Sequence, residues 1–254
     1  MLRPDSSTSS RTRCVLLTVD LERLKVRSGE RLLDAGCGEG RHCFGCVERG
    51  ARVVGLDLDR EPLRLASKAL RKRAAELDSM GEMLQGNTFQ LPFRDETFDK
   101  VICSEVMEHV HDYRAAAREL ARVTKPGGMV AITIPTATSE HLYLRTGDDY
   151  FESPGGHIRI FRPRELSKGL AAAGLATVGV GFAHALHTPY WVLRSLMGLP
   201  RADESRLVQL YRLFLIRATA SREMEWLEKL LNHVFPKSLI LYAEKRMRRA
   251  TSGN

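Results

Sequence analysis

The segment Leu32-Leu33-Asp34-Ala35-Gly36-Cys37-Gly38-Glu39-Gly40 is the most informative part of this 254-residue chain for its fold class. A short apolar run stops at three alternating glycines, and a helical pattern begins at Arg41, which is typical of a buried strand that turns into a helix. Glycines at such a turn let the backbone approach a ligand, and free N–H groups at the helix N-terminus point toward it. The stretch therefore predicts a cofactor-binding turn.

Strands and helices alternate along most of the chain from this turn onward. Strands separated by helical segments imply a parallel sheet with right-handed crossovers, so we expect a doubly wound α/β fold. A polar stretch over 137–161 predicts an irregular loop, and KPGG at 125–128 predicts a turn. The predicted strands are 30–36, 51–59, 98–104, 129–135, 175–182 and 238–246, and the predicted helices are 41–48, 61–77, 115–123 and 163–173, with a helix-rich insertion at 189–234 between the last two strands.

Composition restricts the class of protein. The chain is 43% hydrophobic and 28% charged, which is ordinary for a globular protein and excludes collagen, coiled coil and global disorder. We expect neither a membrane-spanning helix, since no run of 18 apolar residues occurs, nor a secretory signal. Five cysteines, an odd number in a chain of this length, favour a reduced, cytoplasmic location.

The net charge of +8 is unevenly placed: it is +1 over residues 1–140 and +7 over residues 141–254. A basic surface suggests nucleic acid, anionic lipid or an acidic substrate, and the charge does not choose among them. We expect no DNA partner, and peripheral membrane contact through the basic C-terminal half is one interpretation of the charge.

Two features indicate which cofactor the turn binds. Asp57 ends the next strand, 21 residues after Gly36, where a carboxylate can hold ribose hydroxyls. Arg41 stands where a dinucleotide-binding fingerprint has its third glycine. The carboxylates of Asp34 and Glu39 would repel the pyrophosphate of NAD, but they suit the sulfonium and ammonium groups of S-adenosylmethionine (SAM). The pattern favours SAM over NAD, and a NAD-dependent oxidoreductase is the weaker alternative.

At this point the chain resembles the class I S-adenosylmethionine-dependent methyltransferases, within the ubiquinone/menaquinone methyltransferase-like (type 11) group. Their motifs are matched by LLDAGCGEG (32–40), by VVGLDLD (53–59), by GNTFQLPFRDETFDKV (86–101), by Glu108-His109-Val110 and by VTKPGG (123–128). The resemblance covers residues 30–135. It implies a seven-stranded, mostly parallel sheet with the last strand antiparallel.

The composition and the element pattern also divide the chain into parts. We expect a flexible leader at 1–13, a SAM-binding methyltransferase domain over 14–188 and 235–250, and a helical insertion at 189–234 that caps the substrate.

Cofactor contacts follow from the resemblance position by position. Asp34 and the turn at 36–40 would hold the methionyl part, Asp57 the ribose and Leu58 the adenine face. Asn87 and Thr88 would meet the adenine edge; the family usually has Asp at position 87, but Asn can still accept from the adenine amino group. The complete expected set is Asp34, Ala35, Gly36, Cys37, Gly38, Gly40, Asp57, Leu58, Asn87, Thr88 and Ser104.

His109 and His157 are the candidate catalytic residues, each as a general base, although a structural role for His109 is the favoured alternative. His184 and His187 flank the insertion and could line the substrate pocket. We expect no metal, because the cysteines near His42 lack the paired spacing of a zinc site.

The predicted reaction is methyl transfer to oxygen or carbon of a small, hydrophobic or lipid-like acceptor. In an open α/β sheet ligands bind outside the carboxyl ends of the parallel strands, so the apolar insertion would rise beside the methyl donor. A tRNA or rRNA methyltransferase and a non-catalytic scaffold are the alternatives. Methyltransferases that act on base amino groups usually carry the motif D/N-P-P-Y/F after the fourth strand. This chain has Cys103-Ser104-Glu105-Val106 there, without proline or an aromatic residue, which counts against the RNA alternative.

Overall fold

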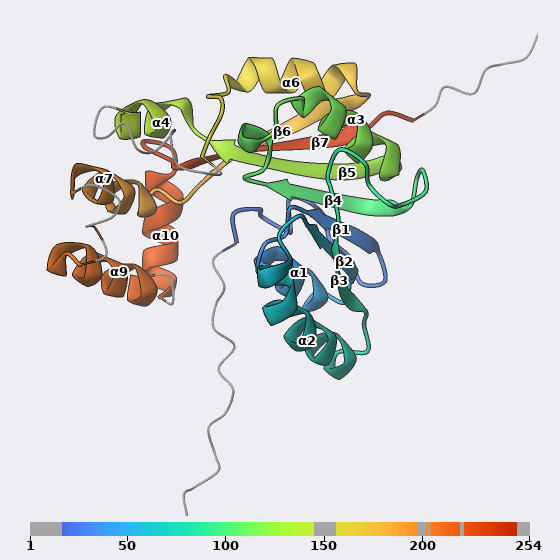
Figure 1. Ribbon diagram of the computed structural model, residues 1–254, viewed down its shortest axis with the longest axis horizontal. Coiled ribbons are helices and arrows are strands. Elements are labelled where there is room, and N and C mark those ends of the chain that lie inside the picture. The colour runs from blue at the N-terminus through green and yellow to red at the C-terminus, as the bar shows by residue number, and fades with distance from the viewer. Residues whose placement is uncertain (1–16, 145–155, 198–201, 203, 219–220, 248–254) are drawn as a thin grey trace, which may run out of the picture.

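The computed structural model describes residues 17–144, 156–197, 202, 204–218 and 221–247 (Figure 1). Seven strands form one sheet in the order β3-β2-β1-β4-β5-β7-β6. Strand β7 runs antiparallel to β5 and β6, whereas the other neighbours are parallel. The predicted doubly wound sheet with an antiparallel last strand is therefore confirmed. The strands are β1 (Arg31–Ala35), β2 (Arg52–Asp57), β3 (Gly81–Gln85), β4 (Phe98–Ser104), β5 (Thr124–Pro135), β6 (Leu175–Ala183) and β7 (Ser238–Lys245).

Helices cover both faces of the sheet, as Figure 1 shows. On one face lie α1 (Arg41–Val47) and α2 (Arg60–Glu76), and on the other lie α3 (Tyr113–Val123) and α6 (Pro163–Ala172). The predicted stripe of α2 packs inward through Leu63, Ala66, Leu70 and Ala74. Because the helices change face between β1 and β4, the crevice at the carboxyl ends of these two strands is the place where this architecture binds ligands.

Strand β3, which forms one edge of the sheet, was not among the predicted strands. Its sequence GEMLQ buries only Gly81 and Met83, because an edge strand has one face against a helix and one toward solvent. Two inward residues are too few to produce a readable alternation.

Two loop predictions are wrong. The predicted turn at 125–128 lies inside β5, where the pairing with β4 shifts from Phe98–Thr124 to Lys100–Met129 and KPGG bulges out. The predicted irregular stretch 137–161 begins with helix α4 (Ala137–Leu144), whose mixed polarity hides a helical period. Residues 145–155 of that stretch lie outside the described part.

The helical insertion between β6 and β7 is confirmed. It comprises α7 (His187–Met197), α9 (Arg206–Ala218) and α10 (Arg222–Leu231), which share a small core of their own. Together with α4 these helices gather at the end of the sheet toward which the arrows of β4 and β5 point (Figure 1). Within the described part of the chain, none of the helices has the length and apolarity needed to cross a bilayer. The expected leader at 1–13 lies outside the described residues.

Candidate active site

The expected cofactor residues lie at the carboxyl ends of four neighbouring strands. The sheet order β3-β2-β1-β4 brings the ends of these strands side by side, although their residues are up to 70 positions apart in the sequence. Asp34, Ala35 and the turn at 36–40 follow β1; Asp57 and Leu58 end β2; Asn87 and Thr88 follow β3; Ser104 ends β4. The structure therefore gathers the predicted set along one edge.

The glycine turn has a backbone that only glycine adopts readily. Gly36, Gly38 and Gly40 have φ values of +80°, +51° and +78°. A Cβ at Gly36 would collide with Val106, whereas a Cβ at Gly38 would meet no atom within 4 Å. Val106 therefore packs against the turn at Gly36, whereas Gly38 faces open space, where a ligand can lie against the main chain.

Asp57 is held by the turn that it faces. Its Oδ2 accepts from the Gly38 N–H at 2.7 Å, and its Oδ1 accepts from the Asp59 N–H at 2.9 Å. A carboxylate has about four acceptor positions, so each oxygen retains one for a ribose hydroxyl. Leu58, next in the chain, is 70% exposed and offers an apolar surface beside that carboxylate.

Asp34 is fully buried beneath the turn. Its Oδ2 accepts from the Cys43 thiol at 3.4 Å, and its Oδ1 has no hydrogen-bond partner within the protein. Burial raises the pKa of the Asp34 carboxyl to about 7. An unpartnered buried carboxylate oxygen suits a positively charged ligand group, so this side chain fits the ammonium end of SAM.

The raised pKa of Asp34 gives a first prediction. A cationic ligand binds the carboxylate form, which is about 10% of the free protein at pH 6 and about 90% at pH 8 when the pKa is about 7. The affinity for S-adenosylhomocysteine should therefore rise roughly tenfold between pH 6 and pH 8, measured by calorimetry. Asp34→Asn should bind with no such rise; an equal rise in that variant would assign the titration to another group.

The remaining cofactor positions are arranged by local contacts. Asn87 is exposed, and its Oδ1 accepts from the Phe89 N–H at 2.9 Å, while Thr88 is buried. Ser104 bonds Thr133 through their hydroxyl groups at 2.9 Å and accepts from Arg41 at 3.3 Å. Arg41 thus reaches from the start of α1 to the end of β4, a contact that the glycine spacing alone did not predict.

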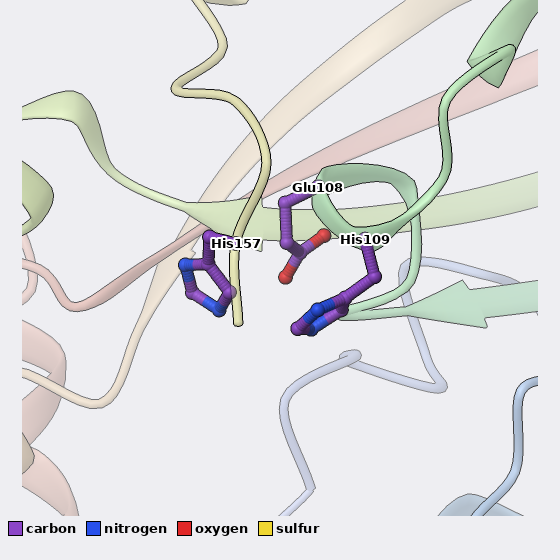
Figure 2. Close-up of side chains that lie close together, drawn as sticks. All are labelled: Glu108, His109 and His157. Carbon is purple, nitrogen blue, oxygen red and sulfur yellow. The ribbon is translucent and has the colours of Figure 1, made fainter. Parts of the chain in front are cut away.

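The two predicted catalytic histidines lie together (Figure 2). Their ring centroids are 4.7 Å apart, with His109 in the short 3-10 helix η1 (Met107–His109) and His157 in the segment before α6. The Nδ1 of His157 lies 2.9 Å from Glu140, which is 1% exposed, and the Nδ1 of His109 lies 3.2 Å from the Gly156 carbonyl oxygen.

Glu108 joins this pair, which sequence reasoning did not foresee. It points toward the gap between the two rings (Figure 2), and one oxygen of Glu108 and one nitrogen of each histidine all lie within 4.8 Å of one another. Burial, and then the nearby Glu105 carboxylate, raise the pKa of Glu108 well above its usual value. Such a group of donors can accept a proton or hold a divalent cation.

Glu105, which follows the carboxyl end of β4, links the insertion to the sheet. It has φ +57° and accepts from Thr133 at 3.0 Å and from Lys237 at 3.3 Å. Although burial opposes it, the Lys237 ammonium holds the pKa of the Glu105 carboxyl below its usual value. Trp191 of α7 lies over the same ammonium at 5.9 Å. Because Lys237 is 132 residues from Glu105, no local pattern could reveal this pair.

The cysteines in the described part of the chain pack in the interior. Cys37, Cys43, Cys46 and Cys103 are buried free thiols, and Cys14 lies outside the described residues. Neither of the two groups of convergent donor side chains in the described part of the chain includes a cysteine.

The fold and the turn define a nucleoside-binding α/β protein, and comparison with known proteins identifies its family. Residues 33–132 match the family described as methyltransferase domain. The chain is 33% identical over 162 residues to the ubiquinone biosynthesis O-methyltransferase of Aeromonas salmonicida strain A449, covering 61% of this chain and 67% of that protein.

Two solved structures are similar in fold. The [4+2]-cyclase SpnF has a TM-score of 0.61 at 22% identity, covering 89% of this chain and 78% of SpnF. Geranyl diphosphate methyltransferase in complex with SAM has a TM-score of 0.60 at 18% identity, covering 89% and 82%. This chain therefore belongs to the class I SAM-dependent methyltransferases, in the ubiquinone/menaquinone methyltransferase-like group, and is an enzyme of that class.

Proposed function

We propose that this methyltransferase uses SAM to methylate a hydroxyl oxygen of a small, hydrophobic, lipid-like acceptor such as a phenol or quinol. The observation that carries the proposal is the His157–Glu140 pair beside the end of β4, next to an insertion with aromatic side chains. Methylation of oxygen needs a group that removes the hydroxyl proton. The relatives named as O-methyltransferases of ubiquinone biosynthesis support an oxygen acceptor.

The donor side of the site is assigned to the ends of β3, β2, β1 and β4. SAM, when bound, supplies a methyl group already activated by its sulfonium. Asp34 would hold the ammonium group, Asp57 the ribose hydroxyls, and Leu58 and Asn87 the adenine. Because methyl transfer is an in-line displacement, the main task of these side chains is to orient the methyl group toward the acceptor.

The acceptor side is assigned to η1, α4 and the insertion. His157 would accept the hydroxyl proton at Nε2, since Nδ1 is directed to Glu140, whose carboxylate orients the ring and stabilises the imidazolium that forms. Trp191 lies over Lys237, which pairs with Glu105 at the end of β4, so α7 brings an apolar surface close to this position.

Trp191 provides a second prediction. Trp191→Ala should lower kcat/KM for a hydrophobic acceptor by about tenfold or more, because burying a large apolar side chain contributes about 1.5–3 kcal/mol. It should leave the affinity for S-adenosylhomocysteine unchanged. Trp226→Ala removes the other tryptophan, which is 68% exposed on α10, and should retain full activity. Equal losses in both variants would contradict an acceptor role for α7.

The test of the function is a transfer assay with radiolabelled SAM and a panel of hydrophobic phenols, quinols and fatty acids, with bulk tRNA as a separate arm. We expect labelled methyl ethers from phenols or quinols, identified by mass spectrometry. Label in the tRNA alone, or in carboxyl groups alone, would overturn the proposal.

We also propose that the enzyme is cytoplasmic and that α9 contacts the surface of an anionic membrane, where a lipid-like acceptor would be found. Three arginines of this helix stand among exposed apolar side chains, a composition that binds anionic interfaces. The apolar residues are Leu207, Leu210, Leu213, Phe214 and Ile216, and the arginines are Arg206, Arg212 and Arg217.

Vesicle sedimentation tests this contact as a third prediction. The protein should sediment with vesicles that contain phosphatidylglycerol and remain in solution with phosphatidylcholine alone. Leu210→Asp should weaken sedimentation severalfold, since it places a charge in the apolar face. The matched variant Leu65→Asp changes a leucine of similar exposure on α2 and should sediment like the unchanged protein. If both variants sediment normally, α9 is not the contact.

A further inference from the structure

A second group of convergent side chains lies at the base of the insertion. His184 follows the end of β6, His187 begins α7, and Glu228 comes from α10. One donor atom from each of the three lies within 4.8 Å of the other two. This group shares no residue with Glu108, His109 and His157, and neither the methyl-donor nor the proposed proton-acceptor assignment uses it.

Two of the three side chains are buried, and the third, His187, is partly buried. His184 is 6% exposed and Glu228 8% exposed, and the two imidazole rings meet edge to face at 5.2 Å between centroids. The Nδ1 of His187 is buried and has no hydrogen-bond partner. An imidazole nitrogen that is withdrawn from water usually has a partner, and a metal ion is one partner that such a nitrogen takes.

Contacts from outside the group fix the orientation of its members. Thr18 lies 2.9 Å from the Nε2 of His184, which leaves Nδ1 as the nitrogen toward the group. This arrangement matches metal-binding histidines, whose second nitrogen is usually held by an oxygen of the protein. His184 also has φ +67°, a strained backbone for a residue with a side chain, and such strain is commonly found at ligand sites.

The backbone around the group is similarly fixed. The Ala185 N–H donates to Oδ1 of Asn232, and the Thr188 hydroxyl donates to the Phe235 carbonyl oxygen, at 2.8 and 3.0 Å. The Lys237 N–H donates to the Ala183 carbonyl oxygen at 3.1 Å. The end of β6 and the start of α7 are therefore tied to the segment after α10, which holds the donors in position before any ion binds.

We propose that His184, His187 and Glu228 bind one divalent transition-metal ion, with Zn²⁺ the ion that suits two imidazole nitrogens and one carboxylate oxygen. Tetrahedral zinc places its donors about 3.3 Å apart, so the donor atoms, which lie within 4.8 Å of one another, need to move together by at most about 1.5 Å to coordinate the ion. The ion would fasten α7 and α10 to the end of β6 and thereby fix the insertion beside the acceptor side.

The charges around the group are compatible with a cation. Burial, and then the Lys237 ammonium, lower the pKa of His187 to about 4, so this imidazole is neutral at pH 7, as a metal ligand must be. Lys237 and Arg41 oppose a cation, but Lys237 is paired with Glu105, and Glu228 contributes a carboxylate.

Competition titration of the metal-free protein with Zn²⁺ against a chromophoric chelator tests the site. We expect one equivalent bound, with the affinity lowered at least tenfold in both His187→Gln and Glu228→Gln. His233→Gln, a change at an exposed histidine after α10, should bind like the unchanged protein, as should His157→Asn, which changes the other donor group. Far-UV circular dichroism of each metal-free variant shows whether it is folded.

Three results would overturn the proposal: no stoichiometric binding, unchanged affinity in folded His187→Gln and Glu228→Gln, or loss of binding in His157→Asn instead. If one of the two ligand variants does not fold, the other decides, because each removes a single ligand. Thermal unfolding of the unchanged protein provides a second readout: Zn²⁺ should raise Tm by mass action, and the rise should be absent in the folded ligand variant.

Discussion

Asp57→Ala should weaken the binding of S-adenosylhomocysteine by at least about 100-fold while the protein remains folded. Hydrogen bonds to a charged group contribute about 1.5–3 kcal/mol each, and this carboxylate has one acceptor position left on each oxygen for the two ribose hydroxyls. Asp57 is partly exposed at the end of β2, so its removal costs little of the core. Calorimetric titration gives the affinity, and thermal unfolding gives the stability.

A matched variant two residues away separates ribose binding from turn stability. Asp59 is the N-cap of α2 and accepts from the Glu61 N–H, so Asp59→Ala should lower the free energy of unfolding by about 1 kcal/mol without a comparable effect on affinity. Asp57→Asn keeps an acceptor for the Gly38 N–H but loses the charge, and it should fall between the two. Unchanged affinity in Asp57→Ala would contradict the ribose assignment.

His157→Asn should lower kcat for the methylated phenol or quinol by at least about 100-fold, the range in which a general base contributes. Cofactor affinity should stay within about twofold, because His157 lies on the acceptor side of the site. Glu140→Gln should lower kcat about tenfold, since the amide still bonds the ring but no longer stabilises the imidazolium. Single-turnover measurements with bound SAM separate the chemical step from product release.

His141→Asn is the control for this pair. His141 is the residue after Glu140 on α4, and its side chain is exposed with Nδ1 directed to its own helix at the Ala137 carbonyl oxygen. The same change there should leave kcat unaltered. If His157→Asn retains full kcat and His109→Asn loses it, the base is His109 and the assignment to His157 is wrong.

Much of the donor side could be predicted from the sequence because its signals are local. The glycines of the 36–40 turn are required by positive φ values, and Asp57 follows at the distance set by one helix and one strand. Both features lie within one short stretch of the sequence, residues 32–59. The same reasoning placed the strands of the sheet interior, since a buried strand is continuously apolar.

The features that sequence reasoning missed depend on contacts between distant segments. Lys237 meets Glu105 across 132 positions, and Glu228 meets His184 only because α10 folds back onto the start of α7. The edge strand β3 has too few inward residues to show its period, and α4 lacks an apolar stripe. The periodicity of a helix or strand indicates which of its own faces is buried. It carries no information on which side chains of other elements pack against that face.

Calorimetric titration of the protein with S-adenosylhomocysteine, in parallel with NAD, measures directly which cofactor the turn binds. The turn at 36–40, the buried Asp34 oxygen and the Asp57 carboxylate predict one site with micromolar affinity for S-adenosylhomocysteine and no binding of NAD. Binding of NAD with comparable affinity, or no binding of S-adenosylhomocysteine to the folded protein, would show that this edge of the sheet is not a SAM site.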